Sequence, residues 1–256
     1  MTDRADRRAA LVTGGNRGIG RSIVEALARQ GLAVVFTYRS DAEEAQAVVD
    51  AIGAEGGTAV ALHLDLEDLD SLDPFAEELT RVLRGRLGRE QLDVLVNNAG
   101  VGPVATAAAT SEEQFDEMFM VNVKGVFFLT QRLLDVIADG GQIINLSSGL
   151  TRFVAPGRVA YAMTKGAIEV FTRHLAAELG PRRIRVNTFA PGPVTTGFGG
   201  GYIRDDGEVR ARLGSLAALG GVADADDIGP AIAALALPAN AFINAERIEA
   251  SGGFKL

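Results

Sequence analysis

The chain has 256 residues, of which 47% are apolar and 23% charged, with a formal net charge of −8 and no cysteine. This negative charge argues against an extended nucleic-acid surface or an anionic-membrane surface, because both partners would repel it. The lack of cysteine excludes disulfides, thiolate metal sites and a cysteine nucleophile.

The start of the chain carries only a short apolar run before Thr13, which is too little for a signal peptide. No run elsewhere approaches the ~18 apolar residues of a membrane span. We therefore expect a soluble, cytoplasmic protein with neither nucleic acid nor membrane as a partner.

Short β-rich runs alternate with longer helical patterns along the whole chain. Strands are expected at 9–13, 33–37, 59–64, 93–97, 142–146, 185–190 and 247–250, and helices at 18–29, 41–54, 69–84, 111–138, 157–179 and 226–236. Most of the strand segments are almost continuously apolar, as parallel strands covered on both faces are. The alternation predicts an α/β, doubly wound parallel sheet with helices on both faces. No repeat or linker divides residues 1–256, so one domain is expected.

Two helix starts carry a capping signal. Ser40 with Glu43, and Thr110 with Glu113, match the capping box, in which the two side chains bond each other's free backbone amides. These pairs predict N-caps at Ser40 and Thr110.

The segment 191–221 is crowded with glycine and breaks the alternation. It is either a long surface loop or a mobile lid, covering about 193–219. We favour the lid because the preceding strand ends where ligands bind to parallel sheets.

The motif TGGNRGIG, residues 13–20, follows the first expected strand and opens the first expected helix. Glycines at 14, 18 and 20 permit a tight turn, close approach of a pyrophosphate and close helix–strand packing. The helix N-terminus offers free amides and a positive dipole end to the phosphates. The motif in this context predicts a dinucleotide site.

The residues after the second strand indicate which dinucleotide is bound. An NAD site has a carboxylate ~20 residues past the loop, on the ribose hydroxyl. Here Tyr38 and Arg39 occupy that position. A guanidinium grips the 2′-phosphate of NADP, which a carboxylate would repel. We therefore predict NADP(H), with Arg17 and Ser40 as further phosphate contacts.

Tyr161 and Lys165 are four residues apart in an expected helix, so their side chains share one face. Lowering the pKa of a tyrosine by about three units takes ~4 kcal/mol. One ammonium ~4 Å away supplies about that much at an effective dielectric near 20. The pair therefore predicts a tyrosine that exchanges protons near neutral pH.

These motifs together resemble the short-chain dehydrogenase/reductase family, in its single-domain branch, over nearly the whole chain. The resemblance is carried by TGGNRGIG, Asp65, NNAG at 97–100, Asn122, Ser148 thirteen residues before Tyr161, Lys165, and PGPVTT at 191–196. It implies a seven-stranded Rossmann fold, hydride transfer between a nicotinamide and a carbonyl or alcohol, and a homotetramer or dimer.

The resemblance also assigns roles to the matching residues. Tyr161 is expected to donate a proton to the carbonyl oxygen, Ser148 to hold that oxygen, and Lys165 to bind the nicotinamide ribose. Asn122 is expected to interrupt its helix and hold a water that links Lys165 to solvent. The expected cofactor-binding residues are Gly14, Asn16, Arg17, Gly18, Ile19, Gly20, Tyr38, Arg39, Ser40, Asp65, Leu66, Asn98, Ala99, Gly100, Tyr161, Lys165, Pro191, Gly192, Val194 and Thr196.

The substrate is less sharply defined than the cofactor. Leu150, Phe153, Phe198 and Tyr202 suggest an apolar pocket mouth. The resemblance is strongest to reductases of 3-oxoacyl thioesters and related ketones. Arg182 falls where those enzymes use a basic residue to dock an acyl carrier, but Asp139 falls where a second one is expected.

Three functions fit these features. The first is an NADPH-dependent reductase of a ketone or aldehyde, such as a 3-oxoacyl thioester. The second is an NADP-binding regulator without turnover, and the third is an NAD-dependent alcohol dehydrogenase. His63 and His174 have no neighbours at metal-ligand spacing, so no metal is expected.

Overall fold

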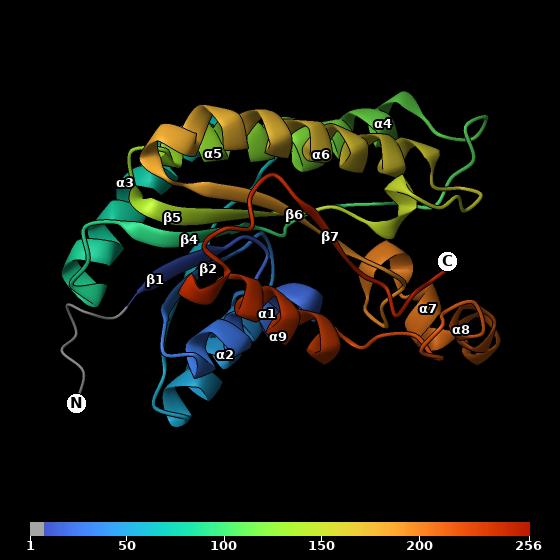
Figure 1. The fold of residues 1–256 in the computed structure, drawn as a ribbon, viewed down its shortest axis with the longest axis horizontal. Helices are drawn as coiled ribbons and strands as arrows, with labels where there is room; N and C mark the ends of the chain where they lie inside the picture. Colours follow the sequence, from blue (N-terminus) through green and yellow to red (C-terminus); the bar gives the residue numbers. More distant parts are fainter. Residues whose placement is uncertain (1–7) are drawn as a thin grey trace.

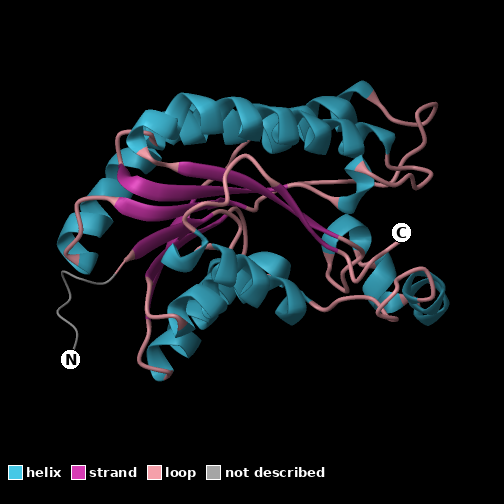
Figure 2. Ribbon diagram, viewed as in Figure 1, coloured by secondary structure: helices cyan, strands magenta, loops and turns pink. Residues whose placement is uncertain are grey.

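A sheet of seven parallel strands forms the centre of the computed structural model, which describes residues 8–256 (Figures 1 and 2). The strand order is β3-β2-β1-β4-β5-β6-β7, so the predicted doubly wound, seven-stranded sheet is confirmed. The strands are β1 Ala9–Val12, β2 Ala33–Tyr38, β3 Thr58–His63, β4 Leu92–Asn97, β5 Ile137–Leu146, β6 Arg185–Pro191 and β7 Arg247–Ala250. Residues 1–7, which belong to the segment predicted not to be a signal peptide, lie outside the described residues.

Nine α-helices accompany the sheet within residues 8–256. They are α1 Gly18–Arg29, α2 Ala42–Ala54, α3 Leu72–Val82, α4 Glu112–Phe119, α5 Val126–Leu133, α6 Val159–Leu179, α7 Tyr202–Asp205, α8 Gly207–Gly214 and α9 Ala225–Leu235. In Figure 1, α1, α2 and α9 cover one face of the sheet and α3, α5 and α6 cover the other. No helix of the described chain combines the length and apolar character needed to cross a membrane.

Strand β1 shows how the sequence builds both halves of the core. Its four residues are fully buried. Ala9 and Leu11 pack into the cluster under α3, α5 and α6, whereas Ala10 and Val12 pack into the cluster under α1, α2 and α9. Because successive side chains of a strand point to opposite faces, a continuous apolar run is what a sheet covered on both sides requires.

The functional end of the sheet is set by its topology. β1 pairs with β2 on one side and with β4 on the other. The connections after β1 and β4 therefore diverge to opposite faces, which opens a crevice at the carboxyl ends of these strands. Ligands of doubly wound sheets bind at this position.

Three predicted boundaries were wrong. The helix expected over 111–138 is α4, a π-helical turn at Met120–Gly125 and α5, and it ends at Leu133. Strand β5 begins at Ile137, five residues before the predicted start, because Gly140 and Gly141 in its first half read as a turn. The helix expected at 69–84 opens with a 3₁₀ turn before Leu72, and Leu83–Leu87 is a further π-helical turn.

Both predicted caps are shifted by one residue. Asp41 rather than Ser40 caps α2, because Asp41 adopts a left-handed conformation (φ 65°) and its side chain accepts from the Glu44 amide. Ser111 rather than Thr110 caps α4, in a capping box with Gln114.

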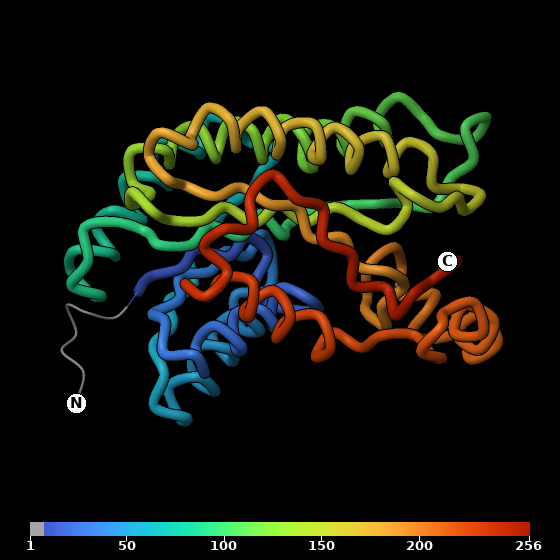
Figure 3. The backbone as a smooth tube through the Cα atoms, in the orientation of Figure 1, coloured from blue at the N-terminus to red at the C-terminus, as the bar shows by residue number. Residues whose placement is uncertain are grey.

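The glycine-rich segment after β6 contains two short helices, α7 and α8, rather than loop alone. Val194 bridges to Ala223 at its base, and Ala217 bridges to Phe254 near the C-terminus. Figure 3 shows the C-terminal strand running down beside this segment. We call residues 193–219 the lid segment.

Helices α1 and α9 pack closely through a glycine. A Cβ at Gly229 of α9 would lie 2.3 Å from the Ser22 hydroxyl and 2.4 Å from the Ser22 backbone carbon of α1. A backbone obstacle cannot rotate away, so this close approach depends on the glycine.

Replacing Gly229 with alanine should therefore push α9 away from α1. We expect Gly229→Ala to lower the free energy of unfolding by about 2 kcal/mol, the cost of overpacking a core site, measured by urea denaturation. Gly53→Ala in α2 is the matched control, because nothing lies within 4 Å of that Cβ position. An equal effect of the two substitutions would contradict the packing argument.

Candidate active site

A cavity of about 850 Å³ lies at the carboxyl ends of the strands. It is lined by the glycine loop after β1, the ends of β2 to β6, the start of α6, the lid segment and the C-terminus. The predicted residues that line it are Gly14, Asn16, Arg17, Gly18, Ile19, Gly20, Arg39, Ser40, Asp65, Leu66, Asn98, Ala99, Gly100, Ser148, Leu150, Phe153, Tyr161, Lys165, Pro191, Gly192, Val194, Thr196, Phe198 and Tyr202. Tyr38 and Asn122 belong to the predicted set but do not line the cavity.

The glycine loop forms a cradle that side chains would fill. Gly14 and Gly18 have positive φ, 66° and 54°. A Cβ at Gly20 would lie 1.9 Å from the carbonyl oxygen of Gly14, and one at Gly14 would lie 3.2 Å from Ala99 Cα. The first turn of α1 therefore lies directly against the loop, with its backbone amides at the cavity. This arrangement suits a pyrophosphate.

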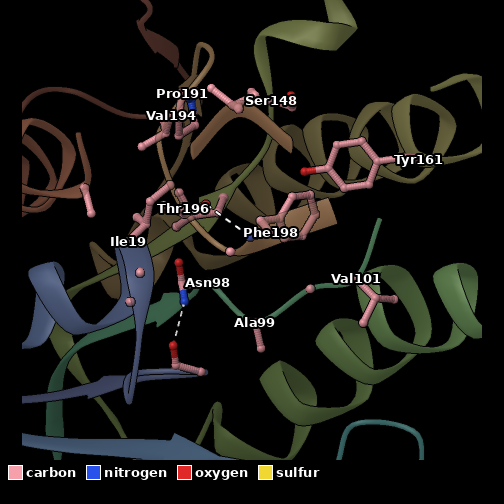
Figure 4. Close-up of a pocket in the computed structure, with 18 of the residues that line it drawn as sticks. Ile19, Asn98, Ala99, Val101, Ser148, Tyr161, Pro191, Val194, Thr196 and Phe198 are labelled. Carbon is pink, nitrogen blue, oxygen red and sulfur yellow. Dashed lines mark hydrogen bonds between the residues drawn. The ribbon is translucent and has the colours of Figure 1, made fainter. Parts of the chain in front are cut away.

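Asn98 locks this loop to the end of β4. Its side-chain Nδ2 donates to the carbonyl oxygens of Thr13 at 2.8 Å and Gly14 at 3.1 Å (Figure 4). The amides of Asn98 and Ala99 both donate to Thr13 Oγ1 at 3.0 Å. These four bonds hold the two walls of the crevice in register.

The far end of the cavity carries the positive charge expected for a 2′-phosphate. Arg17, Arg39 and Ser40 line it. Arg39 Nη1 lies 3.7 Å from Glu67 Oε2, and both side chains are largely exposed, so the pair is weak and the guanidinium remains available.

Tyr38 was predicted to contact the cofactor, but its side chain does not line the cavity. Its ring packs edge-on against His63 at 5.8 Å and joins the core cluster under α1 and α2. As the last residue of β2, it points toward the opposite side from the cavity-lining residues Thr37 and Arg39, in keeping with the alternation of strand side chains.

Tyr161 and Lys165 are both buried, 8% and 5% exposed, on the first turns of α6. The Lys165 ammonium donates to the carbonyl oxygen of Leu146 at 2.8 Å and lies 5.7 Å from the centre of the Tyr161 ring. In Figure 4 the Tyr161 hydroxyl points into the cavity, toward Ser148 and Thr196. Both side chains line the same cavity, in keeping with the shared helix face that their spacing predicts.

The expected electrostatics of this pair were wrong. Burial raises the pKa of Tyr161, and the opposing effects come from Arg158 and from a hydrogen bond with Ser148 rather than from Lys165. Burial also lowers the pKa of Lys165, to about 8. The spacing argument places the Lys165 charge at contact distance from the tyrosine hydroxyl and omits the cost of burying both groups.

Asn122 interrupts its helix as predicted, since it lies in the π-helical turn between α4 and α5. Its side chain is fully buried and bonds both backbone groups of Val101 at 2.8 Å, with a second Nδ2 bond to Thr164 at 3.1 Å. Both amide hydrogens are thus engaged. A water linked to Lys165 stays a prediction. Because both side-chain N–H groups of Asn122 are engaged, such a water would have to donate a hydrogen bond to an oxygen of Asn122.

A partly buried ionic network fixes the Ser148 loop. Glu169 of α6 accepts from Ser147 and Thr151 at 2.7 Å and from Arg247 of β7 at 2.8 Å. Arg247 also bonds Glu249 at 2.8 Å. Bonds from Arg152, Ser251 and Arg247 hold the pKa of the Glu249 carboxyl low, at about 2. The network holds the loop that carries Ser148 against the neighbouring helix and strand.

Several cavity residues were missed by sequence reasoning. Arg158 lies one helical turn before Tyr161, and that spacing was the available signal. Phe254 and Lys255 reach the cavity because the C-terminus folds back along the lid segment, which no local pattern reveals. No group of three or more His, Asp or Glu side chains within residues 8–256 is arranged to hold a metal ion.

A glycine cradle at the switch point of a doubly wound sheet, facing a buried Tyr–Lys pair, defines a nucleotide-dependent oxidoreductase. A family model described as enoyl-(acyl carrier protein) reductase matches residues 14–255. The chain belongs to the short-chain dehydrogenase/reductase family.

Three similar proteins illustrate the relationship. An uncharacterized oxidoreductase of Methylorubrum extorquens is 39% identical, over 97% of this chain and 98% of that protein. A hydroxynaphthalene reductase of Aspergillus fumigatus is 35% identical, over 93% and 89%. The crystal structure of the angucycline C-6 ketoreductase LanV with bound NADP has a TM-score of 0.91 and 42% identity, over 97% of this chain and 95% of that one.

The burial of Lys165 leads to a testable titration. A lysine with a pKa of about 8 is cationic below that pH and neutral above it. The chain has three lysines, so a lysine-labelled NMR titration is simple to assign. We expect the resonance that Lys165→Met removes to titrate near pH 8. Titration of that resonance above pH 10 would show that the side chain is hydrated rather than buried.

Proposed function

We propose that the protein is an NADPH-dependent ketone reductase in which Tyr161 acts as general acid. The observation that carries the proposal is the position of the Tyr161 hydroxyl, which points into the cavity toward Ser148 (Figure 4). Ser148 and Tyr161 together offer two hydroxyl groups to one carbonyl oxygen, which is how developing negative charge is stabilised.

We assign each part of the nucleotide to a part of the cavity. The glycine loop and the first turn of α1 would hold the pyrophosphate, and Arg17, Arg39 and Ser40 the 2′-phosphate. Thr196 and Val194 would meet the carboxamide, and Lys165 the ribose hydroxyls. When bound there, the reduced cofactor supplies a hydride to the carbonyl carbon. The NADP bound by LanV supports this choice of cofactor.

Residues of the chain supply the proton that the substrate oxygen receives. Ser148 holds the substrate oxygen while Tyr161 passes its hydroxyl proton to it. The Tyr161 oxygen is left negative, and the Lys165 ammonium, one turn along α6, provides the route by which a proton returns. A high pKa of Tyr161 is compatible with this role, since reduction needs the tyrosine protonated at the start.

The substrate is proposed to be a ring ketone rather than an acyl-carrier thioester. Phe153, Phe198 and Tyr202 line the cavity and would pack on a flat, apolar molecule. Arg182, the candidate for carrier docking, is engaged by Asp139 at 2.8 Å and by the carbonyl oxygens of Leu134 and Ile137. Its charge is thus compensated within the chain. Two similar proteins are a hydroxynaphthalene reductase and an angucycline C-6 ketoreductase by name, which also favours a ring ketone as the substrate.

Assembly and location stay predictions alongside this activity. A homotetramer or dimer would cover the exposed apolar side chains of α5 and α6, such as Phe127, Met163 and Val170, and light scattering tests it. A cytoplasmic location fits the cysteine-free composition.

Replacing Tyr161 with phenylalanine should separate this function from the alternatives. We expect the rate of NADPH oxidation with ring ketones to fall by about 10²–10⁴-fold, because the general acid is lost, while NADPH binding persists. Tyr38→Phe is the control, since Tyr38 does not line the cavity. Full activity in Tyr161→Phe would refute the assignment. Cofactor binding without turnover of any ketone would favour a regulator.

Arg39→Ala should weaken the preference for NADPH. Loss of a charge-assisted bond to the 2′-phosphate is expected to raise the Kd for NADPH about 10- to 100-fold and to leave the Kd for NADH within about twofold. Fluorescence titration measures both values, and Arg29→Ala on the exposed end of α1 is the control. Equal binding of the two coenzymes by the unaltered protein would favour an NAD-dependent alcohol dehydrogenase.

A further inference from the structure

Arg158 is a buried charge beside the candidate catalytic tyrosine. It precedes the first residue of α6, is only 8% exposed, and lines the cavity. An arginine stays charged under all ordinary conditions, so burial does not neutralise it. Its charge also acts on Tyr161, whose pKa it lowers against the effect of burial.

The guanidinium lies between the cavity floor and the lid segment. Arg158 Nη1 donates to the carbonyl oxygen of Gly102 at 2.8 Å. A Cβ at Gly199 would lie 3.0 Å from Nη2, and the guanidinium stacks over the Tyr202 ring at 5.1 Å. The lid segment therefore closes directly over this cation.

Gly102 also contacts the tyrosine itself. A Cβ there would lie 2.8 Å from Tyr161 Cδ2 and 2.7 Å from Phe198 Cζ. The tyrosine, the arginine and the Phe198 ring thus converge on one glycine. A ketone whose oxygen meets Tyr161 would present its neighbouring atoms to the guanidinium.

No carboxylate pairs with Arg158 in the part of the chain that the structure describes. Arg185 is as deeply buried and also bonds a backbone carbonyl oxygen, that of Asn240, but of the two only Arg158 lines the cavity. A guanidinium carries five N–H donors, and one carbonyl oxygen and one ring do not balance its charge. Burying such a cation without an anion is costly, so its partner is expected to arrive with a ligand.

We assign the cofactor phosphates to other groups of the cavity. The glycine loop contacts Asn98, Ala99 and Thr196, whereas Arg158 contacts Gly102, Gly199 and Tyr202. The two sets share no residue. The 2′-phosphate has its own cations at the end of β2, Arg39 among them.

We propose that Arg158 is a specificity-determining residue that binds an ionised oxygen of the substrate, an enolate or ring phenolate adjacent to the ketone that is reduced. This rests on the proposed function and narrows it to ring ketones with an acidic neighbouring hydroxyl. The guanidinium bonds the anionic oxygen while the phenol of Tyr161 meets the ketone oxygen. Phe198 and Tyr202 pack against the ring that joins the two oxygens.

A pair of matched probes tests the proposal without requiring turnover. 2-Hydroxy-1,4-naphthoquinone is an anion near neutral pH, and its 2-methoxy ether is neutral and of nearly the same shape. Calorimetry on the protein saturated with NADP⁺ gives a Kd for each probe. We expect the unaltered protein to bind the anion about tenfold or more tightly than the ether.

Arg158→Gln retains a donor for Gly102 but removes the charge. We expect it to weaken anion binding about tenfold or more and ether binding less than about twofold. Arg158→Lys should keep part of the preference. Arg210→Gln, an equal loss of charge on exposed α8, should change neither Kd.

The proposal is overturned if Arg158→Gln weakens both probes equally, which would make Arg158 a structural clamp of the lid segment. It is also overturned if the unaltered protein binds the anion no more tightly than the ether. This second test uses only the unaltered protein, so it can be made even if the variants fail to fold. In either case normal reduction of neutral ketones would leave the proposed function intact. Tight anion binding in a protein that reduces no ketone would instead refute the proposed function alone.

Discussion

One buried hydrogen bond, from the Lys165 ammonium to the carbonyl oxygen of Leu146, ties α6 to the end of β5. The chain continues from Leu146 into Ser147 and Ser148, so the bond sets the distance between the serine loop and the helix that carries Tyr161. Burial of an ammonium is tolerated here because a carbonyl dipole faces it. The same burial brings the lysine close to the range in which it gains and loses protons at mild pH.

The glycine-loop wall of the cavity depends on residues that have no side chain. Gly14 and Gly20 allow the loop and the first turn of α1 to touch, and Asn98 then fastens the loop to β4. The two walls of the cavity are therefore formed differently. One wall is backbone brought into close contact, and the other is a set of buried polar side chains held by the network around Glu169 and Arg247.

Most of the fold could be predicted from the sequence, because strands and helices are marked by patterns among residues that are close together in the chain. The apolar runs of most strands are visible directly, and the Tyr161–Lys165 spacing needs only the helix repeat. β5 was cut short because Gly140 and Gly141 resemble a turn, although they lie in a strand. The α2 cap was misplaced because Asp41 takes a left-handed conformation that only the folded chain reveals.

The burial of the side chains in the cavity could not be predicted from the sequence. The proton affinity of Tyr161 depends on how little water reaches it, and this is decided by Phe198 and Gly102, which are distant in the chain. Arg158 was overlooked for the same reason, since an arginine before a helix is usually a solvated residue. Its lack of an acidic partner becomes visible only when every neighbour is in place.

The antiparallel bridge between Ala217 and Phe254 makes the last residues of the chain part of the cavity wall. Leu219 and Lys255 extend the contact through bonds to Gly252 and Leu216. An affinity tag or fusion partner attached after Leu256 would therefore stand beside the cavity. Biochemical work on this protein is better served by a tag that is cleaved from, or never placed on, this terminus.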